Sequence, residues 1–354
     1  MSTYPCINIH LNRITENTKN MVASCNAHNV IPTGVTKLAC AYPEVGQAIL
    51  NGGIKILSDS RIANLKKIRH LDAVTMLLRL PAVSEISDVI EYADISLNSE
   101  AKTLEALSQE AVKQGKEHKV ILMHDLGDLR EGSFYDEETL ALSRKTIELP
   151  GIQLVGLGTN LACYGGVEPT SENQTRLVNL AKQIEADYGI TLQYISGASS
   201  AGLNLMLDNE LPNGINQLRL GASLLMGIGL NDEPVPYTRQ DTFTLTSEII
   251  EIKVKPSVPV NSTALDAFGN KPEFIDRGLR KRAICAIGKQ DVDISEITPI
   301  NKDVLIIGGS SDHLILDIDY CKKDYQVGSL IEFELSYGAV LQCMTSEYIT
   351  KRFL

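Results

Sequence analysis

The sequence predicts an α/β protein: a (β/α)8 TIM barrel followed by a C-terminal all-β domain. Eight strand-like segments follow one another up to residue 220, and helix-like patterns separate them. Such alternation is typical of parallel strands that close into a barrel. Beyond the polar, proline-rich stretch 231–236, strand patterns continue while helical periodicity nearly disappears. The barrel is therefore expected at 12–235 and the β domain at 236–354.

The chain begins with an alternating segment, 6–11, which reads as a strand. It precedes the first barrel helix and has no place in a barrel that starts with a strand, so residues 5–11 are expected to join the β domain. Asn12 should cap the following helix. One face of that helix carries Ile14, Thr18, Met21 and Cys25.

The remaining elements are expected in order along the chain. Barrel strands are expected at 31–36, 54–58, 73–79, 93–97, 119–125, 152–159, 192–196 and 216–220. The clearest helices between them are 99–114, 137–148 and 171–188. Strands of the β domain are expected at 243–255, 283–287, 304–307, 314–318 and 329–335.

Composition excludes several classes of function. A net charge of −11 argues against a nucleic-acid binder and against binding to an anionic membrane surface. The seven cysteines are odd in number, form no CxxC and match no zinc spacing, so we expect reduced thiols in a cytoplasmic protein and no metal site. The N-terminus lacks the pattern of a signal peptide, and no apolar run is long enough to span a membrane.

Lys37 is the first candidate for chemistry. An apolar run, 30–36, leads into this lysine, and a helix should begin near Pro43. Burial lowers the pKa of a lysine, and a neutral amine is a nucleophile toward carbonyl groups. The alternative is a lysine that extends its charge into solvent at the barrel rim.

Four other strand ends carry polar residues on the same, catalytic face of such a barrel. The loop 124–132 contains Arg130, whose planar guanidinium can fix an anionic oxygen, although a surface turn explains the loop equally well. Asn160 follows the sixth strand. The seventh and eighth strands lead into 196–202 and 218–223, with glycines and hydroxyls suited to a phosphate or to ordinary caps and turns. Arg219 either points to the barrel mouth, the open end where these strand ends meet, or closes the barrel with an ion pair.

Together these features indicate a phosphorylated carbonyl compound held by an amine, and pyridoxal phosphate is the obvious one. Four segments, 35–42, 125–132, 199–202 and 219–222, resemble motifs of the alanine racemase-like fold-type III pyridoxal-phosphate enzymes, in the family's order. The resemblance implies that Lys37 carries the cofactor and that Arg130 hydrogen-bonds its phenolic oxygen. The remaining cofactor contacts that it implies involve Tyr42, Asn160, Ser199, Ser200, Gly221 and Ala222, mostly at the phosphate.

The same resemblance places Arg219 against the pyridine nitrogen. An arginine there keeps the nitrogen unprotonated, which favours proton removal and return at Cα over deeper chemistry. A carboxylate at this position, as in decarboxylases of related fold, would make the ring a stronger electron sink.

The C-terminal domain departs from alanine racemase itself. The segment 265–269 lacks the family's catalytic tyrosine, and the segments 288–291 and 308–317 resemble the ornithine racemase branch. Asp266, or less readily His313, could replace the tyrosine as acid or base, and Asp266 and Asp291 could meet a second ammonium group of the substrate. Alternatively, Asp266 is only a turn residue and His313 only a core or turn histidine.

The resulting prediction is a pyridoxal-phosphate-dependent racemase that interconverts L- and D-ornithine by two-base proton transfer at Cα. The resemblance implies a head-to-tail homodimer, with no nucleic-acid or membrane partner. Alternatives are a racemase of lysine, alanine or many amino acids, and a non-catalytic carrier of pyridoxal phosphate. The β domain argues against the carrier, because the single-domain barrel relatives lack it.

Overall fold

The computed structural model describes residues 3–271 and 273–354. The chain divides into two compact units. One is Leu11–Gln240, and the other combines the residues up to His10 with Asp241–Leu354. The barrel unit therefore extends to Gln240, whereas its predicted end was residue 235.

The first unit contains a closed barrel of eight parallel strands, which confirms the predicted fold class. The first barrel strand closes the ring by pairing with the last, Ile31 opposite Gln217. The barrel strands are β2 (Ile31–Val35), β3 (Ile56–Asp59), β4 (Val74–Leu77), β5 (Ile95–Asn98), β6 (His118–Met123), β7 (Ile152–Gly158), β8 (Tyr194–Ser199) and β9 (Gln217–Leu220).

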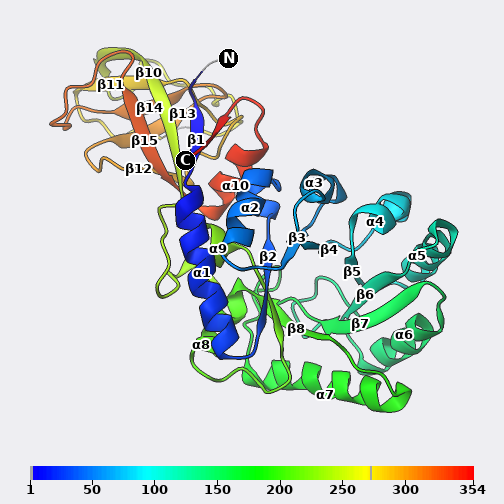
Figure 1. Cartoon of the computed structure of the whole chain (residues 1–354). Helices are drawn as coiled ribbons and strands as arrows, with labels where there is room; N and C mark the ends of the chain where they lie inside the picture. Colours follow the sequence, from blue (N-terminus) through cyan, green and yellow to red (C-terminus); the bar gives the residue numbers. More distant parts are fainter. Residues whose placement is uncertain (1–2, 272) are drawn as a thin grey trace. The chain divides into compact units, whose positions relative to one another are not determined.

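Helices surround these strands: one precedes the first strand, and one follows each strand in turn (Figure 1). They are α1 (Leu11–Ala27), α2 (Pro43–Asn51), α3 (Ile62–Ile68), α4 (Ile86–Tyr92), α5 (Ala101–Gln114), α6 (Asp136–Glu148), α7 (Ser171–Tyr188), α8 (Leu203–Leu207) and α9 (Ala222–Leu225). The described part of this unit also contains four short 3-10 helices: η1 (Lys37–Ala39), η2 (Val83–Glu85), η3 (Ser200–Gly202) and, after α9, η4 (Leu230–Asp232).

Local sequence signals set the helix ends. α2 begins at Pro43, whose fixed φ suits the first helical position and whose missing N–H has no partner there. α7 begins with a capping box in which Thr170 and Asn173 satisfy each other's backbone N–H groups. The prediction for Asn12 was wrong. The chain leaves the sheet at His10 and is helical from Leu11, so Asn12 lies inside the first turn.

Apolar side chains fill the barrel interior, as the burial of strands on both faces requires. This core consists of Ile56, Met76, Ile95, Leu97, Ile121, Met123, Val155 and Tyr194. A filled interior leaves the loops at the strand ends as the place for a site.

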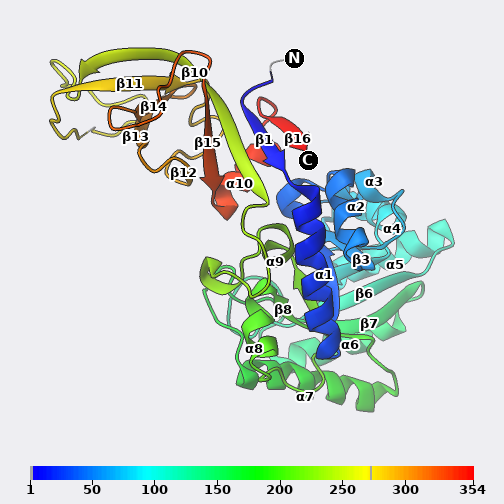
Figure 2. The ribbon, with the colours of Figure 1, turned by 60° about the vertical axis from the view of Figure 1, so that its left-hand side comes forward.

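The second unit is built on an antiparallel sheet with the order β12-β15-β10-β11-β14-β13. β1 (Cys6–Ile9) extends it by pairing antiparallel with β10 and parallel with β16. Figure 2 shows the long ribbon formed by β10 and β11. The other strands are β10 (Phe243–Pro256), β11 (Leu279–Cys285), β12 (Ile297–Pro299), β13 (Leu305–Gly309), β14 (Leu314–Asp317), β15 (Leu330–Leu335) and β16 (Thr350–Phe353).

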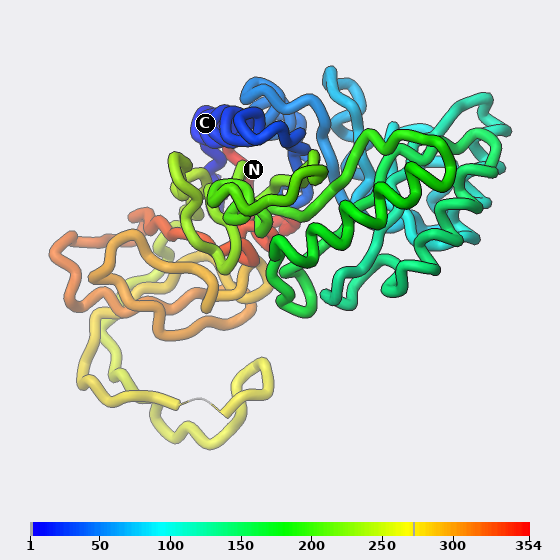
Figure 3. Tube along the Cα trace, turned by 90° about the horizontal axis from the view of Figure 1, so that it is seen from below, coloured from blue at the N-terminus to red at the C-terminus, as the bar shows by residue number. Residues whose placement is uncertain are grey.

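This unit is not entirely β, because the helix α10 (Tyr337–Thr345) follows β15. Ser336 caps it by accepting the N–H of Ala339 at 3.1 Å. The helix, β12 and β16 were not predicted from the sequence. Figure 3 shows the long connection between β10 and β11 in yellow. Within the described residues, no helix has the length and apolar character needed to cross a membrane.

Candidate active site

The predicted cofactor residues of the barrel lie at or after the carboxyl ends of parallel strands, which meet at one end of the barrel. Lys37 follows β2 and lies in η1, partly exposed. Its neighbour Thr36 donates its hydroxyl to Asp59 Oδ2 at 2.8 Å. Asp59 is fully buried and also accepts hydrogen bonds from Arg61 N and Asn64 Nδ2. The backbone just before the lysine is therefore fixed to the end of β3.

The turn after Lys37 is tight. Cys40 and Ala41 both have left-handed φ angles, +49° and +48°, and Tyr42 then leads into α2. Lys67 spans this turn, with Nζ 2.9 Å from Cys40 O and 5.8 Å from the centre of the Tyr42 ring. Burial, and then the neighbouring Cys40 and Glu44, raise the pKa of Tyr42, so its hydroxyl stays protonated and can donate a hydrogen bond.

Arg219, at the end of β9, lies buried in the barrel mouth with 4 % of its surface exposed. Its guanidinium donates to Ser196 Oγ, to Thr159 O at 2.6 Å and to Asn160 Oδ1 at 3.4 Å. Burial lowers the pKa of Arg219 to about 10, with nearby Glu131 opposing and Arg130 adding to the shift. Arg219 is still a cation at neutral pH, and no ion pair of this arginine closes the barrel among the described residues.

Two polar atoms beside Arg219 have no hydrogen-bond partner among the described residues. They are Thr159 Oγ1 and Asn160 Nδ2, and both are buried. A buried polar group without a partner costs about 1–3 kcal/mol. These atoms are therefore available to hydrogen-bond a polar ligand.

Donor groups also converge between the ends of β8 and β9. The hydroxyls of Ser200 and Ser223 lie 3.0 Å apart, and the backbone N–H groups of Gly221 and Ser223 both approach Ser200 Oγ at 3.3 Å. Ser199 is turned differently, because its hydroxyl accepts the N–H of Ala201 at 3.4 Å. Ala222 begins α9 directly beside this group. Hydroxyls and amides gathered in this way fit a phosphate.

Arg130 lies in the loop after β6, with its guanidinium against Glu131 and against Cys163 Sγ at 2.7 Å. The loop folds back on its own strand through Asp125 N to Ser133 O and Ser133 N to Met123 O. Asp125 Oδ1 accepts the N–H groups of Gly127 and Leu129, which tightens the turn. The loop is thus an ordered turn that also presents a cation.

The predicted residues of the second unit lie in its loops and strand ends. Asp266 is exposed, and its Oδ1 accepts the N–H groups of Phe268 and Asn270. His313 has Nδ1 3.0 Å from Asp312 Oδ1 and is partly exposed. Asp291 is buried, and its carboxylate accepts the Ser346 hydroxyl at 3.1 Å and the Gly288 N–H at 3.4 Å.

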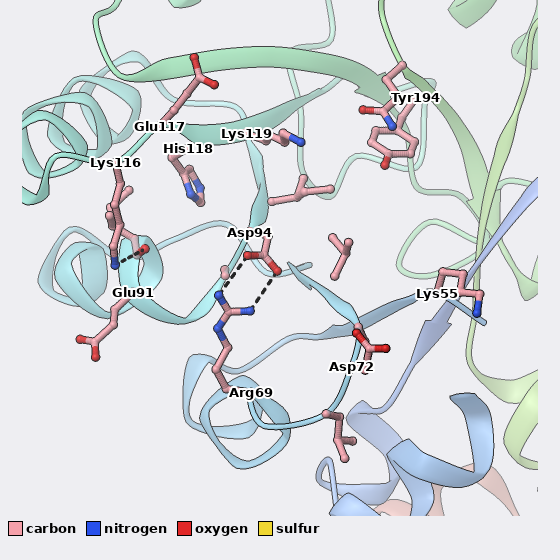
Figure 4. A pocket seen from close by; sticks show the side chains of 17 residues that line it. Lys55, Arg69, Asp72, Glu91, Asp94, Lys116, Glu117, His118, Lys119 and Tyr194 are labelled. Atoms are coloured by element: carbon pink, nitrogen blue, oxygen red, sulfur yellow. Dashed lines mark hydrogen bonds and ion pairs between the residues drawn. The ribbon is translucent and has the colours of Figure 1, made fainter. Parts of the chain in front are cut away.

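A cavity of about 950 Å³ opens at the other end of the barrel, where the strands begin. Figure 4 shows Arg69 and Asp94 in a two-point ion pair inside it, with N–O distances of 3.2 and 3.3 Å. His118 is buried beside it and meets Ser96 Oγ at 2.8 Å. Burial lowers the pKa of His118 to about 4, so the ring is neutral. These groups satisfy one another, as expected for a structural end of the barrel.

Comparison with known proteins agrees with this geometry. Residues 9–228 match the family model described as alanine racemase, N-terminal domain. This chain belongs to the alanine racemase family. It is 42 % identical to the ornithine racemase of Acetoanaerobium sticklandii over 99 % of this chain and 100 % of that one. It is 37 % identical to the lysine racemase of Thermotoga maritima over 98 % of each.

Solved structures give the same fold. An alanine racemase from Bartonella henselae with covalently bound pyridoxal phosphate superimposes with a TM-score of 0.74 at 16 % identity, over 100 % of each chain. The family therefore confirms the predicted class, a pyridoxal-phosphate-dependent amino-acid racemase with a small-molecule substrate.

Several residues around the site were missed by sequence reasoning. Asp59 supports the lysine turn, Ser196 accepts a hydrogen bond from Arg219, Ser223 contacts the Ser200 hydroxyl and Glu131 holds Arg130. Asp59 ends β3, Ser196 lies within β8, and Glu131 and Ser223 lie in segments that follow β6 and β9. What was not visible in the sequence is which side chain each of them would meet.

Proposed function

We propose that this enzyme interconverts L- and D-ornithine with pyridoxal phosphate. The observation that carries the proposal is the barrel mouth, where Lys37, the phosphate cradle at Ser200 and the buried Arg219 occur together. The substrate follows from the full-length identity of 42 % to a protein named ornithine racemase. Lysine is the second candidate, supported by the 37 % identity to a lysine racemase.

Different residues of the barrel mouth would hold different parts of the cofactor. Lys37 Nζ would hold the carbonyl carbon. Ser200, Gly221 and Ala222, with Tyr42 and Ser199 beside them, would hold the phosphate. Arg219 and Asn160 would face the ring, since Asn160 Nδ2 is unpartnered among the described residues and Arg219 is charged. Arg130 would donate to the phenolic oxygen.

When bound, pyridoxal phosphate withdraws electrons from Cα of the attached amino acid and so makes its proton removable. Lys37 Nζ would remove or return this proton on one face. Because Arg219 is a cation, it would donate a hydrogen bond to the pyridine nitrogen and leave that nitrogen unprotonated. Such a contact would limit electron withdrawal and favour simple inversion at Cα.

A group of the second unit, supplied by the partner subunit of a head-to-tail homodimer, would act on the other face. Asp266 is the first candidate. Backbone N–H groups, that of Asn270 foremost, lower its pKa, so it is a carboxylate and a base at neutral pH. His313, beside Asp312, is the second candidate. Asp266 and Asp291 are the proposed partners of the substrate's distal ammonium. A cytoplasmic location is also proposed, supported by seven free cysteines.

Proton NMR of the purified protein with pyridoxal phosphate and L-ornithine in heavy water, followed by chiral analysis, tests this function. We expect exchange at Cα together with D-ornithine, and loss of both in Lys37→Ala. Lys113→Ala is the matched control, because Lys113 lies on the surface of α5 beside Glu110. Loss of D-ornithine with retained exchange in Asp266→Asn or His313→Asn would identify the second base.

Other outcomes would contradict the proposal. Turnover of lysine or alanine without turnover of ornithine would replace the substrate. A visible cofactor band with no exchange for any of the three amino acids would favour the non-catalytic carrier. A monomer in gel filtration would argue against a base supplied by a partner subunit.

A further inference from the structure

Asp128 is a fully buried carboxylate in the loop after β6 and follows Asp125 by three residues. It accepts four backbone N–H groups from the loop after β7. Oδ2 accepts Tyr164 N at 2.9 Å. Oδ1 accepts Gly165 N at 3.1 Å, Val167 N at 3.3 Å and Cys163 N at 3.4 Å.

The carboxylate is ionised in this setting. Burial alone would raise the pKa of Asp128, but the N–H groups of Tyr164, Val167, Cys163 and Gly165 together lower it. Hydrogen bonds to a charged acceptor are about twice as strong as neutral ones. The segment 163–167 is therefore fixed to the loop after β6 through one side chain.

A second observation shows that these two loops are built against each other. A Cβ at Gly165 would lie 2.8 Å from Asp128 O, closer than real Cβ atoms come to backbone. Glycine at 165 thus allows the backbones to approach, and the hydrogen bond from Ala162 N to Val167 O at 2.8 Å closes the loop on itself.

The fixed loop delivers Cys163 to Arg130. Cys163 Sγ accepts a hydrogen bond from Arg130 Nη1 at 2.7 Å, while Glu131 holds the other side of the guanidinium. Arg219 interacts electrostatically with Arg130, Glu131 and Cys163, so this cluster borders the buried arginine of the mouth.

We propose that Asp128 is a positioning residue for the reaction: by gathering the N–H groups of 163–167 it sets Cys163 against Arg130 and so fixes the guanidinium at the barrel mouth. The effect on catalysis rests on the proposed role of Arg130 toward the cofactor. The effect on the loop does not.

The variant Asp128→Asn tests it with little change of shape. Both oxygens of Asp128 accept N–H groups, whereas an asparagine has only one acceptor oxygen. Its NH₂ group would face N–H donors on one side of the cluster, so the hydrogen bonds on that side would be lost. In the cofactor-free protein, we expect the rate at which an aromatic disulfide reagent labels Cys163 to rise about tenfold, the value of one charged hydrogen bond. Among the described residues Cys163 is the most exposed cysteine, while Cys40 and Cys321 are half-buried, so Cys163→Ser identifies the share of Cys163 in the labelling.

In the holoenzyme, we expect kcat/KM for ornithine to fall about 10- to 100-fold, as misplacement of a catalytic group does. The pH dependence of the visible cofactor band should shift as well. Asp293→Asn is the matched control, since Asp293 also accepts a backbone N–H, that of Ser295, but in the β domain. Gly165→Ala is the second variant. It should raise the labelling rate in the same way while it keeps the carboxylate.

Unchanged labelling in both Asp128→Asn and Gly165→Ala would overturn the positioning of Cys163. Faster labelling with unchanged kcat/KM and an unchanged pH titration of the cofactor band would overturn the role in the reaction. Asp128 would then only stabilise the loop, and its substitution would lower thermal stability without affecting catalysis. If the wild-type protein racemises no amino acid while the two variants are labelled faster, the proposed function fails and the positioning of Cys163 by Asp128 stands.

Discussion

Two glycines of the Arg130 loop offer a sharp test of how this loop is held. Gly127 and Gly132 have nearly the same backbone angle, φ +115° and +114°. Their surroundings differ. A Cβ at Gly127 would meet nothing within 4 Å, whereas one at Gly132 would lie 2.8 Å from Asp125 N and 2.9 Å from the carbonyl carbons of His124 and Met123.

The cost of alanine at each position follows from this difference. Forcing an alanine into this φ region costs about 1–3 kcal/mol at both sites. At Gly132 the new methyl group also strikes backbone atoms that cannot swing away, which adds about 1–3 kcal/mol. The bonds from Asp125 N to Ser133 O, 2.9 Å, and from Ser133 N to Met123 O, 3.2 Å, lie at the clash and would open.

Urea unfolding followed by circular dichroism measures both costs, and kcat/KM for ornithine reports the position of Arg130. We expect Gly132→Ala to lower the free energy of unfolding by about 1–3 kcal/mol more than Gly127→Ala does. It should also lower kcat/KM more strongly, since Gly132 directly follows Arg130-Glu131. Equal losses of stability in the two variants would refute the contact reasoning and leave only the shared φ cost.

Three further expectations follow from single side chains. Ser200→Ala should weaken pyridoxal-phosphate binding about tenfold in a fluorescence titration, because it removes one hydroxyl of the phosphate cradle; unchanged binding would place the phosphate elsewhere. The pKa of His118, about 4, lies below its ordinary value near 6.5, so its stabilising effect is complete above pH 6.5 and is lost as the pH falls toward 4. The free energy of unfolding should fall by roughly 3 kcal/mol over that pH range. In urea unfolding, the His118→Gln variant should show a smaller fall between the same pH values. Arg280 pairs with the buried Asp317 at 2.8 Å and with the partly exposed Asp319 at 3.0 Å, so Arg280→Met should lower the stability of the β domain in urea unfolding. Adding Asp317→Leu should restore much of it, and a double variant no better than the single one would contradict the pair.

The barrel was predictable because its signals are local. Eight apolar segments, each separated from the next by a helical pattern, require parallel pairing and a ring, and the observed strands begin and end within a few residues of the predicted ones. The order of Lys37, Arg130, Ser200 and Arg219 at four strand ends was likewise visible, since the carboxyl ends of barrel strands always meet on one face. Short elements were not predictable in the same way. The nine residues of α10 and the three of β12 give too few repeats to define a period.

The sequence by itself thus determined the fold class and the residue types at the carboxyl ends of the strands, where the candidate site is proposed. Only the tertiary structure decided which of these residues meet. Asp128 lies 35 residues from Cys163 and Thr36 lies 23 from Asp59, and no local pattern couples such pairs. Their contacts arise from the closure of the barrel, which brings strand ends together whatever their distance along the chain. For the same reason the burial of Arg219, which lowers its pKa to about 10, is a property of the folded barrel mouth. The same holds for the amide nitrogen of Asn160, which has no partner among the described residues.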